Sequence, residues 1–431
     1  MTDGRAEAPA MTPSAELDLA FARSRFPALA GEWTYLDNAG GAQTLGAVAD
    51  AVRDYLLTVN VQHGASYEPS RRAVAAVAAG QAAVAELFGA ADPAEILLGP
   101  STTVLMQNLA RALVAGGALR AGDEVIVTDV DHEANIGPWR RLAELGVGVR
   151  EWRLDRPSLR LRAEDLAPLL SPRTRLVAFS HCSNVIGSFH DVPALAALAH
   201  QAGARVAVDG VAYAPHRRID VAALGADFYA CSLYKVYGPH LAALWGRRAD
   251  FVALGKLNHD FLADDDVPYK LQPGGPCYEL AAALPAIPDY LVELGRRAGA
   301  DPAAGRGAAL ERAFAAIAAH EEALAARLLE FLAARPEVTL IGDPSPARAR
   351  RAPTVSFVAA GRDSEEIVRR VDAARIGIRF GHFYARRLID ALGLAERQGV
   401  VRVSMVHYNS PQEVDRTILA LERALDQGRT V

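Results

Sequence analysis

Residues 205–239 read RVAVDGVAYAPHRRIDVAALGADFYACSLYKVYGP and carry the pattern that decides the fold. Two short apolar runs, 205–208 and 228–232, flank a helical segment at 221–224, and neither run strictly alternates apolar with polar residues. Runs of this kind are typical of parallel strands that are buried on both faces. Each run leads into polar residues, Asp209 after the first and Ser232 to Lys235 at the end of the second.

The same alternation of apolar runs and Ala/Leu-rich segments occupies most of the chain before residue 246. Further strands are expected at 96–98, 124–128, 149–153, 175–180 and 241–245. Further helices are expected at 102–114, 136–145 and 193–202. The pattern predicts an α/β fold with a mostly parallel seven-stranded sheet covered by helices on both faces.

The second part of the chain reads as a smaller α+β unit. Residues 296–307, RRAGADPAAGRG, are rich in Gly, Ala and charge and predict a connection. Beyond it we expect strands at 338–341, 354–359 and 400–405 and helices at 308–334, 365–374 and 411–426. We therefore divide the chain into a flexible tail (1–14), an N-terminal segment that packs on the small domain (15–36), a large domain (37–295) and a small C-terminal domain (296–431).

Composition narrows the classes of protein. The 431 residues are 51% apolar and 23% charged, so a large core is expected. The net charge of −5 argues against a nucleic-acid binder or a polybasic membrane anchor. No signal peptide and no membrane-spanning run is recognisable, and three cysteines without a CxxC spacing argue against a disulfide framework and a zinc site. These observations predict a cytoplasmic protein without a metal.

Polar residues follow five of the predicted strands, and in open parallel sheets ligands bind at that edge. They comprise Ser101 to Thr103, which open a helix and suit a phosphate, and His132, residues 181–184 (HCSN), Asp209 and Lys235. Each has an ordinary alternative when taken alone: a helix N-cap at Ser101, solvated turns around His132 and 181–184, a turn aspartate, or a lysine lying along Tyr rings. P-loop, GxGxxG, HExxH and GxSxG motifs are absent from the sequence.

Taken together, these strand ends meet the needs of pyridoxal 5′-phosphate. A helix start would take the phosphate, and His132 would stack on the ring. Asp209 would keep the pyridine nitrogen protonated, and desolvated Lys235 would hold the aldehyde as a Schiff base. The constellation predicts this cofactor.

The chain also resembles the class V aminotransferases, specifically the cysteine-desulfurase-like branch of the fold-type-I pyridoxal-phosphate enzymes. The resemblance rests on motifs in the family's order: 35–40 (YLDNAG), 131–139 (DHEANIGPW), 180–184 (SHCSN), 208–210 (VDG), 234–239 (YKVYGP) and 408–415 (YNSPQEVD). It covers nearly the whole chain and implies a homodimer with a shared active site that binds an amino-acid substrate.

The resemblance also implies a role for each matching residue. Lys235 would form the Schiff base, Asp209 would pair with the ring nitrogen, and His132 would stack on the ring and handle protons. Thr102, Thr103 and Ser232 would hold the phosphate, and Asn184 would lie near the phenolic oxygen and the substrate. Arg402, with Arg379, would bind the substrate carboxylate, and Gly274 and Gly275 would come from the partner subunit.

Three departures from the family pattern bear on the reaction. Residues 379–384 read RFGHFY, so Tyr384 occupies the position of the cysteine that accepts sulfur in the desulfurases. Tyr234 stands where those enzymes usually have His, and Ala212 stands where they have Gln. We expect Tyr213 or His216 to compensate for the missing Gln.

These departures leave several functions open. The leading hypothesis is a lyase that eliminates a β-substituent, such as a C–S lyase, without a catalytic cysteine and with Tyr384 as a catalytic residue. The alternatives are an epimerase, a carbon–carbon bond-forming or cyclising enzyme of natural-product metabolism, an aminotransferase, or a non-catalytic scaffold that binds the cofactor.

Overall fold

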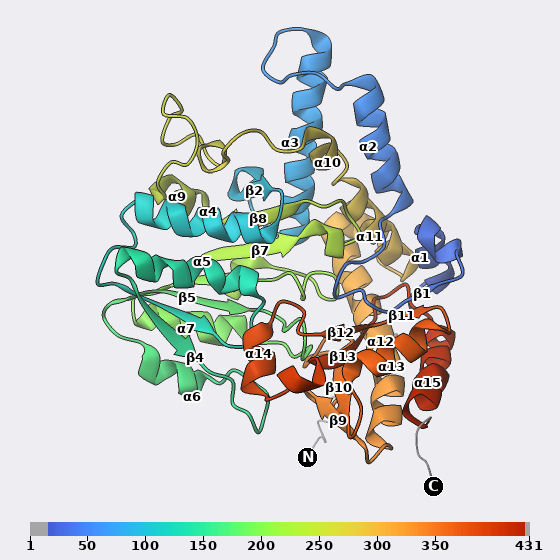
Figure 1. Ribbon diagram of the computed structural model, residues 1–431. Coiled ribbons are helices and arrows are strands. Elements are labelled where there is room, and N and C mark those ends of the chain that lie inside the picture. The colour runs from blue at the N-terminus through green and yellow to red at the C-terminus, as the bar shows by residue number, and fades with distance from the viewer. Residues whose placement is uncertain (1–15, 427–431) are drawn as a thin grey trace, which may run out of the picture.

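The computed structural model describes residues 16–426, and the predicted tail at 1–14 lies outside them. The largest sheet has seven strands in the order β2-β8-β7-β6-β5-β3-β4 (Figure 1). The strands are β2 (Ile96–Gly99), β3 (Glu124–Thr128), β4 (Gly148–Trp152), β5 (Thr174–Ser180), β6 (Arg205–Asp209), β7 (Phe228–Ser232) and β8 (Ala242–Gly246). All pairs from β7 to β4 are parallel, whereas β8 is antiparallel to both neighbours. The predicted α/β architecture with a mostly parallel seven-stranded sheet is confirmed.

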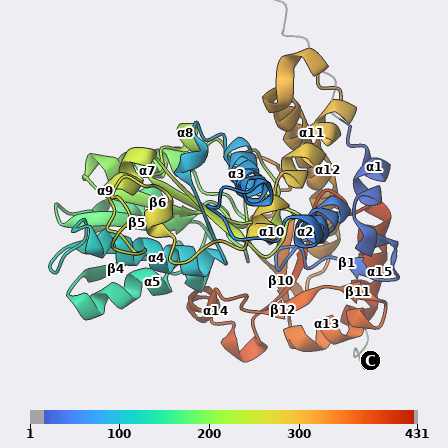
Figure 2. The ribbon, with the colours of Figure 1, turned by 90° about the horizontal axis from the view of Figure 1, so that it is seen from above.

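Helices cover both faces of this sheet (Figure 2). One face carries α4 (Thr102–Ala115) and α5 (Gly137–Arg140), and the other carries α3 (Glu68–Phe88), α7 (Val192–Gln201) and α8 (Val221–Leu224). Successive strand residues point to opposite faces, so Val125 and Val127 belong to the buried cluster with Leu105 of α4, and Ile126 belongs to the opposite cluster. Burial on both faces explains why the strands lack alternation.

One predicted helix is wrong in its form. Instead of a helix over 136–145, α5 covers four residues and passes into a 3₁₀ helix at Arg141–Leu145. Pro138 sits in the first turn of α5, where its missing N–H is tolerated, and Gly146 ends the segment with a φ of 81°.

A second, antiparallel sheet has the order β12-β13-β10-β9. Its strands are β9 (Val338–Ile341), β10 (Thr354–Ala359), β12 (Arg379–Gly381) and β13 (Val400–Ser404). They pack with α12 (Gly305–Ala333), α13 (Ser364–Asp372) and α15 (Pro411–Asp426). A short strand of the N-terminal segment, β1 (Thr34–Tyr35), pairs in parallel with β11 (Ile376–Gly377) beside this unit. The division of the chain at 295/296 stays a prediction.

The remaining helices lie around these two sheets (Figure 1). They are α1 (Leu19–Ser24), α2 (Gly46–Thr58), α6 (Ala163–Leu166), α9 (Arg248–Ala253), α10 (Tyr278–Ala282), α11 (Ala286–Arg297) and α14 (Arg386–Ala391). Of the predicted connection at 296–307, residues 298–304 join α11 to α12, whereas its two ends belong to these helices, which pack closely against each other.

The close packing of α11 and α12 leads us to predict that a substitution at Gly295 lowers the stability of the fold. A Cβ atom there would lie 1.8 Å from the carbonyl oxygen of Ala309, so Gly295→Ala must push the two helices apart. We expect the free energy of unfolding to fall by about 1–3 kcal/mol, the usual cost of overpacking. The control Gly307→Ala places a methyl group in open space on α12 and should raise the same quantity by about 0.5–1 kcal/mol. Denaturant unfolding of both variants checks the pair, and an unchanged midpoint for Gly295→Ala would contradict it.

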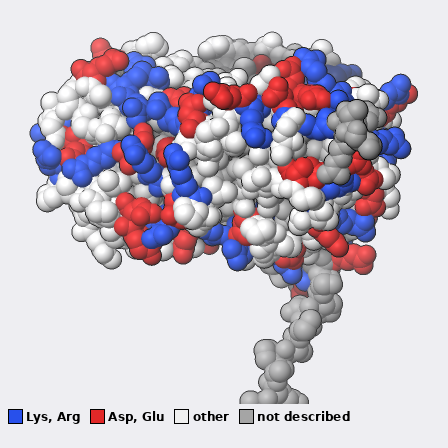
Figure 3. Space-filling view, turned by 60° about the horizontal axis from the view of Figure 1, so that its bottom comes forward, with Lys and Arg blue, Asp and Glu red and all other residues white. Residues whose placement is uncertain are grey.

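Basic and acidic side chains are interspersed on the face shown in Figure 3. Within residues 16–426, several ion pairs join side chains one helical turn apart, for example Arg369 with Glu365 on α13. Across residues 16–426 no helix combines the length and the apolar character needed to cross a bilayer.

Candidate active site

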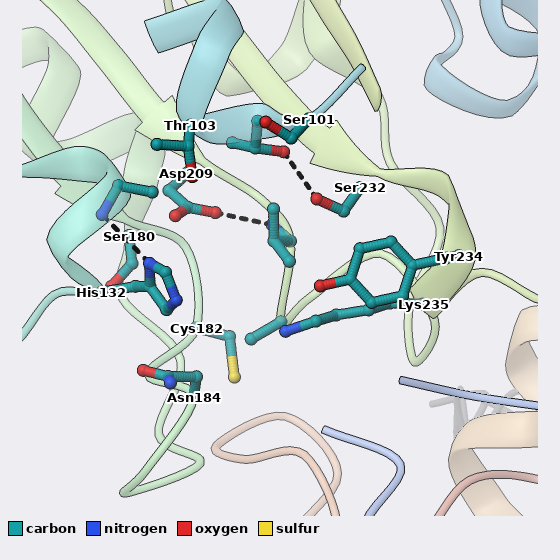
Figure 4. Close-up of a pocket in the computed structure, with 14 residues that line it drawn as sticks. Ser101, Thr103, His132, Ser180, Cys182, Asn184, Asp209, Ser232, Tyr234 and Lys235 are labelled. Carbon is teal, nitrogen blue, oxygen red and sulfur yellow. Dashed lines mark hydrogen bonds between the residues drawn. The ribbon is translucent and has the colours of Figure 1, made fainter. Parts of the chain in front are cut away.

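A pocket opens at the edge of the large sheet where β5, β6 and β7 end and α4 begins (Figure 4). The predicted site residues that line it are Thr102, Thr103, His132, Asn184, Asp209, Ser232 and Lys235. Parallel strands bring their carboxyl ends to one edge, so residues far apart in sequence converge here.

Lys235 ends a short 3₁₀ helix, Leu233–Lys235, directly after β7. The side chain is 7% exposed, and its Nζ has no hydrogen-bond partner among the described residues. Figure 4 shows the amine in the pocket beside Tyr234, whose ring centroid lies 6.0 Å from Nζ. Burial, followed by the charge of Arg402, lowers the pKa of this amine to about 8. Lys235 is therefore a more available nucleophile and base at neutral pH than a surface lysine.

Asp209 is the last residue of β6 and is 5% exposed. Its Oδ1 accepts a hydrogen bond of 2.9 Å from the backbone N–H of Val211, which leaves Oδ2 without a hydrogen-bond partner among the described residues. Burial raises the pKa of the carboxyl, and the Val211 N–H and the Lys235 amine oppose that shift. A buried carboxylate with one free oxygen suits a cationic N–H.

The N-terminus of α4 forms another part of the pocket. The Ser101 hydroxyl caps the helix by accepting from the Val104 N–H at 3.2 Å, so the N-cap reading of this residue holds. Thr102 Oγ1 and Ser232 Oγ lie 2.7 Å apart, and Thr103 lines the pocket beside them. Hydroxyls next to the free amides of a helix start suit an anion such as a phosphate.

His132 presents a neutral ring to the pocket. Its Nδ1 accepts a hydrogen bond of 3.0 Å from the Ala134 N–H, so the ring proton sits on Nε2. Burial, together with the charges of Lys235 and Arg402, lowers the pKa of His132 to about 4. The imidazole is thus uncharged at neutral pH and can stack on an aromatic ring or donate through Nε2.

Arg402 lies on β13 and is 1% exposed. It donates to the Asn184 carbonyl at 3.0 Å and to Asp37 Oδ1 at 2.7 Å, and its guanidinium lies 3.7 Å from the Phe383 ring centroid. Its Nε is buried and has no hydrogen-bond partner within residues 16–426. The structure therefore places the predicted carboxylate-binding arginine next to the pocket but already paired with a carboxylate of this chain.

The segment after β12 lies at the mouth of the pocket. Tyr384 is 64% exposed, its carbonyl accepts from the Glu133 N–H at 2.8 Å, and its ring centroid is 5.2 Å from that of His132. Arg379 is exposed and lies 3.7 Å from Asp37 Oδ2. Both residues line the adjoining cleft rather than the pocket itself.

Two other groups of predicted residues lie elsewhere. Gly274 and Gly275 are exposed in a loop that does not line this pocket. The expectation that Tyr213 or His216 compensates for Ala212 is wrong for the pocket within this chain. Neither lines the pocket: half-buried Tyr213 stacks on His181 with ring centroids 3.4 Å apart, and buried His216 is held by Glu321 at 2.9 Å.

Sequence reasoning did not single out Asp131 and Ser180. Asp131 is fully buried and accepts hydrogen bonds of 2.8 Å from Ser180 Oγ and from Asn135 Nδ2. Burial raises its pKa to about 7, with a further contribution from Asp209. The sequence shows an acidic residue directly before His132, which could have marked Asp131 as a candidate. The two groups that donate hydrogen bonds to it are brought close only by the fold.

These residues fit pyridoxal phosphate. The pocket combines an amine without a hydrogen-bond partner (Lys235), a buried carboxylate with a free oxygen (Asp209), a neutral ring (His132) and a helix start with hydroxyls. The cofactor's aldehyde, pyridinium N–H, ring face and phosphate need these four kinds of group.

Comparison with known proteins agrees with this fit. A protein-family model described as aminotransferase class-V matches residues 34–299 and 302–417. The aminotransferase-like protein FGM3 of Gibberella zeae is 44% identical over 94% of this chain and 97% of its own length. A probable cysteine desulfurase of Pseudomonas aeruginosa is 35% identical over 93% and 96%. The crystal structure of the cysteine desulfurase CsdA from Escherichia coli superposes with a TM-score of 0.79 at 29% identity, over 95% of this chain and 98% of that one.

The motifs along the chain, the fold and the matches over nearly its whole length agree on one assignment: the chain belongs to the class-V aminotransferase family, and its relatives include cysteine-desulfurase-like proteins.

Proposed function

We propose that this protein is a pyridoxal-phosphate lyase that eliminates a β-substituent, foremost a thiol, from an amino acid without the help of a cysteine thiolate. The observation that carries the proposal is that none of the three cysteines presents a reactive thiol to the pocket. Cys182 lines the pocket, but its Sγ points to the carbonyls of Ser183 and Gly187, and burial raises its pKa to about 12. Cys231 is fully buried, and exposed Cys277 lies outside the pocket.

The pocket supplies the other groups that such a reaction needs. Bound pyridoxal phosphate would supply an electron sink conjugated to the α-carbon of the substrate. Lys235 would hold the cofactor aldehyde and take the α-proton, and Asp209 would keep the ring nitrogen protonated. Arg402, Arg379 and Asn184 would orient the substrate carboxylate, while Tyr384 and His132 would offer protons to the leaving group at the mouth.

An assay with S-substituted cysteines tests this function. Each turnover should convert one conjugate and one water into one thiol, one pyruvate and one ammonium ion. Cys182→Ala and Cys277→Ala should each retain the turnover rate within about twofold, because a thiol that takes no part contributes no stabilisation of the transition state.

Other outcomes would overturn the proposal. Exchange of the α-proton for deuterium without pyruvate would indicate an epimerase, and a coupled product would indicate a bond-forming enzyme. Amino transfer that requires a keto acid would indicate an aminotransferase, and loss of turnover in Cys277→Ala with a protein persulfide would indicate a desulfurase. A protein that binds the cofactor but shows none of these signals would be a scaffold.

The lowered pKa of Lys235 predicts how the uptake of the cofactor depends on pH. Because the pKa is lowered to about 8, the neutral amine predominates above that pH and is progressively lost below it. Uptake of pyridoxal phosphate by the cofactor-free protein, followed by absorbance, should therefore rise with pH and level off just above 8. An uptake rate that keeps rising to pH 10 would contradict the lowered pKa.

We also propose a cytoplasmic homodimer in which residues 272–276 of one subunit reach the pocket of the other. This proposal is supported by the exposure of Gly274 and Gly275 in a loop outside their own pocket. Light scattering of the purified protein tests the dimer.

A further inference from the structure

A buried chain of side chains links α11, the small sheet and the turn that carries Lys235. Tyr290 Oη on α11 lies 2.5 Å from His407 Nε2, and His407 Nδ1 lies 3.0 Å from Tyr237 Oη. The Tyr237 hydroxyl donates to the Pro215 carbonyl at 3.0 Å. Tyr237 follows Lys235 by two residues, and we call Tyr290, His407 and Tyr237 the relay.

The direction of each hydrogen bond in the relay is fixed. Tyr237 has one hydroxyl proton and donates it to Pro215, so its oxygen must accept from His407 Nδ1–H. Burial lowers the pKa of His407 to about 3, and the neutral ring therefore has a bare Nε2. That nitrogen accepts the Tyr290 hydroxyl proton. Each of the three protons in the relay, on Tyr290 Oη, His407 Nδ1 and Tyr237 Oη, is donated to one acceptor.

Water does not compete for these bonds. Tyr237 and His407 are fully buried, and Tyr290 is 7% exposed. The ring of Phe26 packs against all three side chains, with centroid distances of 5.6 Å to each tyrosine and 6.0 Å to His407. Hydrogen bonds in such an apolar shell are strong, and a member left without its partner is costly.

The relay contacts the turn that carries Lys235, and the side chain of Lys235 does not help to hold this turn in place. Because Lys235 Nζ has no hydrogen-bond partner among the described residues, the position of the amine follows from the backbone of the turn. Within it, the N–H groups of Val236 and Gly238 both donate to the Leu233 carbonyl. Tyr237 adopts a φ of +67°, which non-glycine residues rarely adopt unless the surroundings impose it. The two hydrogen bonds of the Tyr237 hydroxyl contribute to that restraint, together with the Leu45 N–H, which donates to the Tyr237 carbonyl at 3.0 Å.

The middle member of the relay, His407, lies on the substrate side of the site. His407 follows β13, the strand that carries Arg402, by three residues. The Ser404 N–H at the end of β13 donates to the Leu36 carbonyl at 2.7 Å, which fixes this end of the strand next to Asp37. A displacement of His407 would therefore move the lysine turn and the end of β13 relative to each other.

We propose that the Tyr290–His407–Tyr237 relay positions the turn of Lys235 and fixes its amine relative to Arg402. These three are positioning residues, since none of them lines the pocket. The proposal rests on the proposed function only in taking Lys235 as the reacting amine.

The test compares Tyr237→Phe and His407→Leu with His407→Asn, whose amide N–H replaces Nδ1–H as the donor to Tyr237. Misplacement of a reacting group by a fraction of an ångström should lower kcat about 10-fold or more in the first two variants, with KM changed less than about twofold. His407→Asn should recover most of kcat. The control His200→Leu removes a histidine hydrogen bond of 2.9 Å to Asp227, which directly precedes β7 at the end of the strand opposite the pocket, and should leave kcat at its wild-type value.

A second readout does not depend on turnover. In the cofactor-free protein, the labelling rate of Lys235 by an amine-reactive reagent, followed by peptide mass spectrometry across pH, reports the environment of the amine. We expect its midpoint to move in Tyr237→Phe and His407→Leu and to return toward wild type in His407→Asn.

The proposal is overturned if Tyr237→Phe and His407→Leu lower only the melting temperature and leave both kcat and the labelling midpoint at wild-type values. Wild-type protein that takes up pyridoxal phosphate but releases no pyruvate would refute the proposed lyase function alone. The labelling comparison would still decide the relay in that case.

Discussion

Replacing Lys235 by alanine is expected to abolish turnover and to remove the yellow absorption band that a protonated Schiff base of pyridoxal phosphate gives. The variant loses both the covalent anchor of the cofactor and the base that takes the α-proton. We expect kcat to fall by at least about 10³-fold. Removal of a buried amine that makes no hydrogen bond to any described residue should leave the fold intact. Spectra and rates of the loaded protein check the prediction.

The chain makes this experiment unusually clear because it has only three lysines, Lys235, Lys256 and Lys270. Borohydride reduction of the loaded wild type should attach the pyridoxyl group to the peptide of Lys235 alone. The control Lys256→Ala removes a lysine that pairs with Asp264 near the surface and should keep the band. A reduced adduct on another lysine, or an unchanged band in Lys235→Ala, would refute the assignment of Lys235 as the residue that forms the Schiff base.

Asp209→Asn should have the next largest effect. The amide keeps the shape of the carboxyl and can still accept the Val211 N–H, but it cannot stabilise a positive charge on the ring nitrogen. Loss of such a preorganised charge is expected to lower kcat about 10²-fold or more while the visible band is retained.

Asp191→Asn is the matched control for this substitution. Asp191 also accepts a backbone N–H, that of Ala194, at the start of α7, and asparagine caps a helix equally well. Its activity and melting temperature should equal those of wild type. If Asp209→Asn loses the cofactor band and stability but keeps its turnover per bound cofactor, Asp209 has a structural role instead.

Much of the large sheet could be predicted because its strands are buried on both faces and end in polar residues. The sequence around Asp209 and Lys235 indicated two neighbouring strand ends, and the structure brings them together in one pocket. The antiparallel direction of β8 could not be predicted, because an apolar run such as ALWG carries no signal for its direction. The short β12 also escaped prediction, since three residues are too few to show a period.

Within the site, single residues were easier to predict than the pairs they form. His132, Asn184 and Ser232 stand at strand ends, whereas the Asp131–Ser180 bond joins residues 49 positions apart and the Asp37–Arg402 pair joins residues 365 positions apart. The contact between Tyr237 and His407, which are 170 positions apart, could not be predicted for the same reason. Local sequence determines which strand end a side chain occupies, but the packing of distant elements determines its partner.

The pair between Asp37 and Arg402 gives the site an internal counter-ion. A substrate carboxylate that takes the place of Asp37 on this guanidinium exchanges one anion for another rather than creating a new ion pair. Arg379, 3.7 Å from the other oxygen of Asp37, lies where it can receive the displaced group. Such an exchange leaves the number of ion pairs unchanged, so affinity should depend only weakly on ionic strength.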